Sequence, residues 1–155
     1  MTNIIQNRNK ADDYFQVGCS VSFSKTVSEH EINLFADISG DFSPNHVNEE
    51  FMKNSIYGKR IAHGALLVAY MSKASSLILE EYPHEDQDST AVSLGYDRIR
   101  FIKPVFIDDI ITITYTVDEY DFQSIRAQST IEIVNQKNEL VAIATHILTW
   151  VPNSE

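Results

Sequence analysis

Residues 64–79 read GALLVAYMSKASSLIL. Wound into a helix, this stretch has apolar side chains on nearly every side, which is typical of a buried helix rather than of an amphipathic surface helix. The serines at 72, 75 and 76 interrupt the pattern where a packed helix can still bond them. The stretch therefore predicts a long central helix that begins at Gly64 and that the rest of the chain must cover.

Alternating sequences after this helix predict long β-strands. Ile111, Ile113 and Tyr115 alternate with threonines, as expected for strands with one buried face. Strands are expected at 91–101, 110–119, 125–135 and 140–151, with a further strand at 17–27. Turn-forming residues at 118–122 and 135–138 separate them. One apolar helix with a run of long antiparallel strands predicts an α+β fold, in which the sheet wraps round the helix.

The segment between the first strand and the central helix predicts two further helices. Ser28 and Glu31 fit a capping box, and Gly40 is a suitable end for the helix that follows it. Asn48 is a suitable cap for a short helix at 49–53. The buried side of the first of these helices is expected to carry Ile32, Phe35, Ala36 and Ile38.

Length and composition indicate one domain. The chain has 155 residues, of which 43% are hydrophobic, enough for one ordinary core. We expect a loose arm at 1–14 and a single domain at 15–155. No stretch resembles a signal peptide or is long enough to cross a bilayer, and one cysteine, Cys19, excludes an intrachain disulfide. We therefore expect a cytoplasmic protein that has no membrane partner.

The formal charge makes nucleic acid an improbable partner. The chain has 22 acidic and 12 basic residues, a net charge of -10. A surface of this sign repels a phosphate backbone. Any anionic ligand must therefore bind at a local basic patch.

An acid and a base lie close together at 39–46, which reads SGDFSPNH. Asp41 and His46 are five residues apart, and Pro44 prevents a continuous helix between them. Gly40 can adopt the left-handed conformation that ends a helix. The two side chains are therefore expected to flank one turn and to face the same small volume.

Gly64 supplies a third functional group, a backbone amide at the start of the helix. The first amides of a helix have no partner inside it, and the helix dipole favours negative charge beside them. An acid, a base and an oxyanion donor together indicate proton transfer next to a carbonyl group. The five histidines show neither the His-x-x-x-His spacing nor the cysteine partners of a zinc site, so no metal is expected.

The sequences SGDFSPNH at 39–46 and IAHG at 61–64 resemble the hydratase motif of the MaoC-like (R)-specific enoyl-CoA hydratases, which have the hotdog fold. The resemblance implies that Asp41 and His46 activate the water that adds to a trans-2-enoyl thioester, giving a (3R)-3-hydroxyacyl product, or catalyse the reverse dehydration. It assigns the oxyanion amide to Gly64 and a place near the site to Ser72. It also implies a homodimer and no cofactor other than the carrier of the substrate.

The motif differs from the usual family pattern at two positions. Ser43 stands where asparagine is usual, and Asn45 stands where leucine or isoleucine is usual. Serine can still make the side-chain bond that shapes the turn, whereas Asn45 puts a polar group at an apolar anchor. With His63, these residues are expected to support the site. Two alternatives stay open: a hotdog thioesterase, and a non-catalytic module that binds acyl thioesters.

The carrier of the thioester is either coenzyme A or an acyl carrier protein, and both are anionic. A basic patch is therefore required despite the acidic composition. The expected contacts are Lys59, Arg60, Arg98, Arg100 and Lys103. The net charge disfavours docking of an acidic carrier protein, unless residues 98–103 form the contact.

Overall fold

The computed structural model describes residues 14–154, which form four helices and one five-stranded antiparallel sheet. The arm predicted at 1–14 lies outside the described residues, apart from Tyr14. The strands are β1 (Ser20–Thr26), β2 (Ser89–Phe101), β3 (Ile110–Asp121), β4 (Arg126–Asn135) and β5 (Leu140–Pro152). The helices are α1 (Glu29–Ser39), α2 (Pro44–Val47), α3 (Glu49–Lys53) and α4 (Gly64–Glu81).

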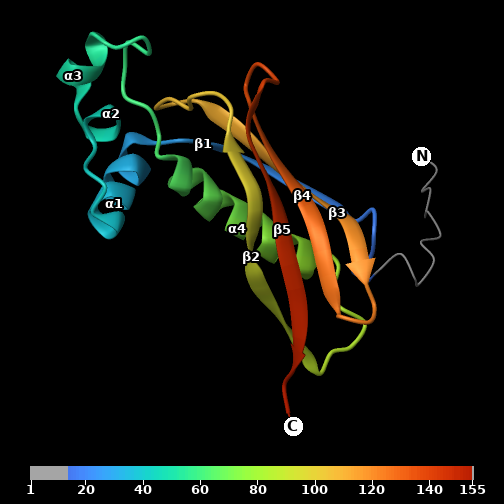
Figure 1. Ribbon diagram of the computed structural model, residues 1–155. Helices are drawn as coiled ribbons and strands as arrows, with labels where there is room; N and C mark the ends of the chain where they lie inside the picture. Colours follow the sequence, from blue (N-terminus) through green and yellow to red (C-terminus); the bar gives the residue numbers. More distant parts are fainter. Residues whose placement is uncertain (1–13, 155) are drawn as a thin grey trace, which may run out of the picture.

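The sheet has the order β1-β3-β4-β5-β2 and curves around α4 (Figure 1). In β3, Ile111, Ile113 and Tyr115 are fully buried against the helix side, while the intervening threonines are only partly covered. This alternation follows from the two-residue period of a strand. It confirms the predicted α+β fold with an antiparallel sheet wrapped around a central helix.

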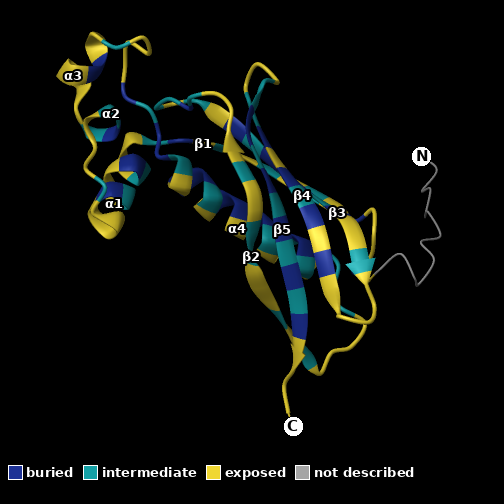
Figure 2. Cartoon of the chain, viewed as in Figure 1, coloured by how far each residue is buried: buried dark blue, intermediate teal, exposed yellow. Residues whose placement is uncertain are grey.

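The central helix packs against the sheet on one side only. Leu67, Met71 and Ile78 are almost completely buried, whereas Ala65 and Ser72 are exposed. Figure 2 shows that buried and exposed residues both occur along α4. The prediction that α4 is buried all round is therefore wrong for the single described chain. A sheet can cover only one side of a cylinder, and the uncovered side of α4 carries mostly small residues.

The helices α1, α2 and α3 project beyond the sheet near the first turn of α4 (Figure 1). The predicted capping box is present, because Ser28 Oγ accepts from Glu31 N at 3.2 Å and Ser28 N donates to Glu31 Oε2 at 3.0 Å. Gly40 ends α1 with φ 76°, and its N–H donates to Ala36 O at 2.8 Å. These local bonds place Asp41 directly after the helix.

Three local features differ from the predictions. Ile38 is 76% exposed, because it lies about 120° round α1 from buried Ile32. The strand β3 continues to Asp121, so the turn lies at 122–125 rather than 118–122. Pro44 begins the short helix α2, at the helix position where its missing N–H costs least.

None of the helices within residues 14–154 combines the length and apolarity needed to cross a bilayer.

The core contains an imidazole that no motif indicated. His146 is fully buried, with Nδ1 2.9 Å from Tyr115 Oη and Nε2 2.8 Å from Ser93 Oγ. The ring of Tyr96 stacks on the imidazole at 4.6 Å between centroids. Burial disfavours the charged imidazole and lowers the pKa of His146 to about 4.

Replacing Met71 by alanine should lower the free energy of unfolding by about 2 to 5 kcal/mol, because the change leaves a cavity between α4 and the sheet. The control is Ser76→Ala on the exposed side of the same helix, with an expected change within about 0.5 kcal/mol. Urea titration of both variants measures the difference. Equal effects would contradict the one-sided burial of α4.

The stability of the protein should decrease below neutral pH because of His146. Above its ordinary pKa of 6.5 the ring is neutral in both states, and between 6.5 and about 4 only the unfolded chain takes up the proton. The expected loss is about 3 kcal/mol, at about 1.4 kcal/mol per pH unit. Urea titrations from pH 7.5 to 4 measure it, and His146→Gln should reduce the slope. An unchanged slope in a folded His146→Gln variant would contradict this assignment.

Candidate active site

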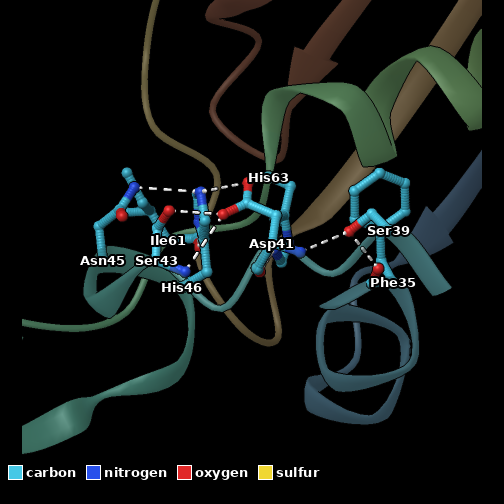
Figure 3. A network of polar contacts seen from close by, with 8 residues as sticks. All are labelled: Phe35, Ser39, Asp41, Ser43, Asn45, His46, Ile61 and His63. Atoms are coloured by element: carbon cyan, nitrogen blue, oxygen red, sulfur yellow. Dashed lines mark hydrogen bonds and ion pairs between the residues drawn. The ribbon is translucent and has the colours of Figure 1, made fainter. Parts of the chain in front are cut away.

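The segment 39–47 of the projecting helices meets the segment 60–64 at the first turn of α4. Figure 3 shows Asp41, His46 and His63 together at this junction. The carboxylate and the imidazole come from the turn after α1 and from α2, and the second imidazole comes from the residue before α4. The predicted acid and base therefore face a common volume.

Asp41 is held as a carboxylate by the turn that follows it. Its Oδ1 accepts hydrogen bonds from Ser43 N at 3.1 Å and from Ser43 Oγ, and its backbone N donates to Ser39 Oγ at 3.1 Å. The hydroxyl and the amide of Ser43 stabilise the ionised form and lower the pKa of Asp41. Ser43 thus makes the turn-shaping bond expected of it, and Oδ2 is left to face His46.

His46 is oriented by a backbone carbonyl. Its Nδ1 donates to Ile61 O at 2.8 Å, so in the neutral ring Nε2 is the acceptor. Nε2 accepts from Asn45 Nδ2 at 3.1 Å and lies 4.0 Å from Asp41 Oδ2. A gap of 4.0 Å is too long for a direct hydrogen bond and suits a bridging water molecule.

His63 packs underneath the pair. It is 1% exposed, and its Nε2 donates to the backbone O of Asp41 at 3.0 Å. Its ring stacks on the ring of His46, with centroids 3.8 Å apart, and contacts Phe35 at 4.8 Å. Burial is the main cause of its lowered pKa, and the neighbouring His46 adds to it. His63 is therefore held neutral while it contacts both members of the pair.

Gly64 begins α4 beside a pocket of about 250 Å³ that His46 also lines. The N-cap residue, His63, makes no side-chain hydrogen bond to the amides of the first turn of α4, so the cap leaves these amides uncovered. A Cβ atom on Gly64 would lie within 2.6 Å of two ring carbons of Phe101. The absence of a Cβ on Gly64 therefore leaves room for the Phe101 ring against the start of α4. Other lining residues are Tyr57, Ile61, Leu67, Ile102 and Lys103.

The predicted carrier contacts have different environments. Arg60 is only 7% exposed and is bonded inside the protein, so it is not a surface cation as expected. Lys103 lines the pocket and pairs with Glu139 at 2.7 Å, and Lys59 Nζ lies 4.4 Å from the centre of the Phe106 ring. Arg98 and Arg100 are exposed on β2.

Ser72 lies away from the acid and the base within this chain. It is eight residues beyond Gly64, about 12 Å along the helix, and faces solvent. The site also uses groups that the sequence analysis did not assign to it. The Ile61 carbonyl carries no side-chain signal, and Phe101 belongs to a distant strand whose packing no local pattern reveals.

Asp41, His46 and His63 offer ligand atoms within 4.8 Å of one another, a spacing at which three groups could hold a metal ion. The two imidazoles, however, are stacked at 27°, and each has one ring nitrogen bonded to a backbone carbonyl. Stacked rings direct their nitrogen lone pairs side by side rather than toward one tetrahedral centre. The arrangement fits a hydrogen-bonded acid-base pair better than a metal centre.

Comparison with known proteins agrees with this geometry. Residues 15–140 match the family described as MaoC like domain. The chain belongs to this family. A 100-residue stretch is 36% identical to an (R)-specific enoyl-CoA hydratase of Rhodospirillum rubrum, covering 64% of each chain. A 3-hydroxybutyryl-CoA dehydratase of Methylorubrum extorquens is 30% identical over 104 residues, covering 67% of this chain and 61% of that protein.

A solved structure has the same fold. The (R)-hydratase from A. caviae involved in PHA biosynthesis superposes with a TM-score of 0.75 at 26% identity, covering 87% of this chain and 96% of that one. The hotdog fold of this MaoC-like chain is thereby confirmed. The matched part spans less than two thirds of the length of the two curated relatives.

Gly64→Ala should destabilise the protein by about 0.5 to 1.5 kcal/mol, because the added methyl group overlaps the Phe101 ring and turns this half-exposed side chain into a less favourable rotamer. The second variant, Gly64→Ala with Phe101→Ala, removes the overlap and should recover most of the loss. Phe101→Ala alone is the control, since that side chain is half exposed. Urea titrations that give additive effects would show that the two residues do not contact as described.

Proposed function

We propose that the protein catalyses the (R)-specific hydration of trans-2-enoyl thioesters such as enoyl-CoA, or the reverse dehydration. One observation carries the proposal: His46 Nε2 and Asp41 Oδ2 lie 4.0 Å apart beside the pocket at Gly64. The names of the two curated relatives and of the A. caviae structure support the same chemistry.

In the forward direction the imidazole of His46 acts first as a base and then as an acid, while Asp41 holds the water molecule. A water molecule held between Asp41 and His46 loses a proton to Nε2 while its oxygen attacks C3 of the enoyl group. Charge moves onto the thioester oxygen, where the Gly64 amide donates a hydrogen bond and lowers the barrier. A proton then reaches C2 from the imidazolium, which restores the enzyme, so no metal or cofactor is needed.

Asn45 affects how the water molecule binds. Its side-chain amide donates to His46 Nε2, the same lone pair that must accept the proton of the water molecule. The water therefore has to displace this amide or the amide has to turn aside. This bond is also the observation that favours the second candidate function, a module that binds acyl thioesters without turning them over.

The product should have the (3R) configuration. Asp41 and His46 approach from the projecting helices, and Gly64 holds the carbonyl at the first turn of α4, so one face of the double bond meets the water. Fixed donors on both sides of the substrate allow a single orientation. The choice of (3R) rather than (3S) is inferred from the names of the (R)-specific relatives.

A homodimer completes the proposal. The edge strand β2 exposes Val92 and Leu94, and the uncovered side of α4 exposes Ala65, Ala69 and Ser72. A second copy on these surfaces would cover the unpaired strand edge and the uncovered side of the helix. Covering α4 would also bring Ser72 into an enclosed region. The cytoplasmic location stays a prediction.

Asp41→Asn should reduce hydration of a short trans-2-enoyl-CoA by at least about 10²-fold, because the asparagine amide lacks the negative charge with which the carboxylate holds the water molecule. The loss of enoyl absorbance measures hydration, and a thiol reagent measures hydrolysis of the thioester. The control is Asp37→Asn, an exposed carboxylate on α1, which should retain the wild-type rate.

The same assay separates the alternatives. Loss of enoyl absorbance without release of thiol is expected for the wild-type protein. Release of thiol would favour the thioesterase, and binding without either change would favour the non-catalytic module. Full activity in Asp41→Asn would contradict the role of this carboxylate.

A further inference from the structure

The segment 60–63 contacts the backbone of both proposed catalytic residues. His63 Nε2 donates to the backbone O of Asp41 at 3.0 Å, and Arg60 Nε donates to the backbone O of His46 at 2.6 Å. Between them, Ile61 O accepts from His46 Nδ1 at 2.8 Å, and Ile61 N donates to Asn45 O at 3.0 Å. Two side chains of one short segment therefore hold the two backbone carbonyls.

The guanidinium of Arg60 is itself held by two residues of α1. Its Nη1 pairs with Glu29 at 2.5 Å, and its Nη2 donates to Asn33 Oδ1 at 2.7 Å. Both partners lie on α1, whereas the Nε bond reaches α2. The planar guanidinium makes these three bonds in fixed directions, which a lysine cannot do. Arg60 therefore fixes the position of α2 relative to α1.

The turn that carries the acid has few other long-range restraints. Phe42 is 57% exposed and Ser43 is also exposed. Among the residues that the structure describes, the Asp41 carboxylate accepts hydrogen bonds from Ser43 alone. Bonds within the turn set its local shape but do not set its distance from His46. That distance depends on groups that contact both ends of the turn.

We propose that Arg60 and His63 form a carbonyl clamp, a pair of positioning residues that sets the separation of Asp41 and His46. The proposal rests on the function proposed above for this pair. Arg60 supplies the hydrogen bond at the His46 end. His63 supplies the hydrogen bond at the Asp41 end and the ring on which His46 stacks.

Variants at His63 separate its two contributions. His63→Gln retains an N–H donor near the position of Nε2 and loses the ring, whereas His63→Phe retains the ring and loses the donor. We expect kcat to fall by about 10- to 100-fold in His63→Phe, with KM within about twofold, because a displacement near 1 Å can cost this much. His63→Gln should recover a large part of kcat.

Variants at Arg60 test the other end of the clamp. Arg60→Met removes all three bonds, and Arg60→Lys retains the positive charge but loses the planar guanidinium. Both variants should lower kcat with little change in KM. The matched control is Glu29→Gln, which weakens the ion pair of Arg60 but leaves the bond to His46 O. This control should retain kcat within about twofold even where its melting temperature falls.

Nitrogen-15 NMR of the His46 ring provides a readout that does not depend on turnover. The Nδ1–H signal, bonded to Ile61 O, should stay sharp in the wild-type protein and in Glu29→Gln. It should broaden or shift in Arg60→Lys and His63→Phe. If these folded variants keep both the signal and kcat, the clamp is wrong. If the wild-type protein hydrates no enoyl thioester, the proposed function fails, while the NMR result still decides whether the clamp exists.

Discussion

The burial of α4 in the curve of the sheet is the constraint on which the site depends. The helix contacts β3 and β1, and side chains such as Met71 and Ile78 are fully buried in the close-packed core, which fixes its position. The position of the first turn follows from this packing, and so does the position of the Gly64 amide. The close approach of Phe101 then joins β2 to the same turn and forms one wall of the pocket.

Asp41 and His46, the proposed acid-base pair, show how different environments can prepare two groups for one proposed reaction. Asp41 stays partly exposed, and the hydrogen bonds from Ser43 keep its carboxylate ionised. His46 is buried, and the Ile61 carbonyl determines which ring nitrogen can accept a proton. The neutral ring of His63 beneath it adds no competing positive charge. The pair therefore combines a negative group with a proton acceptor across a gap of 4.0 Å.

The acidic composition and the proposed anionic substrate are compatible only if the local charges at the pocket differ from the average. Lys103 lines the pocket, although Glu139 partly neutralises it. Arg60, which the sequence indicated as another surface cation, instead serves the interior. Its charge is compensated by Glu29 and its N–H groups are used by the backbone and by Asn33. Charge-assisted hydrogen bonds such as these three offset the cost of burying a guanidinium.

The sequence by itself determined the features that depend on neighbouring residues. The capping box at Ser28, the left-handed Gly40, the alternation in β3 and the short spacing of Asp41 and His46 all follow from bonds or periodicities within a few residues. Only the tertiary structure decided that Arg60 is buried, that one side of α4 is uncovered and that His146 lies in the core. These outcomes depend on contacts between segments far apart in the chain, such as Arg60 with Glu29 and Gly64 with Phe101, which no local pattern encodes.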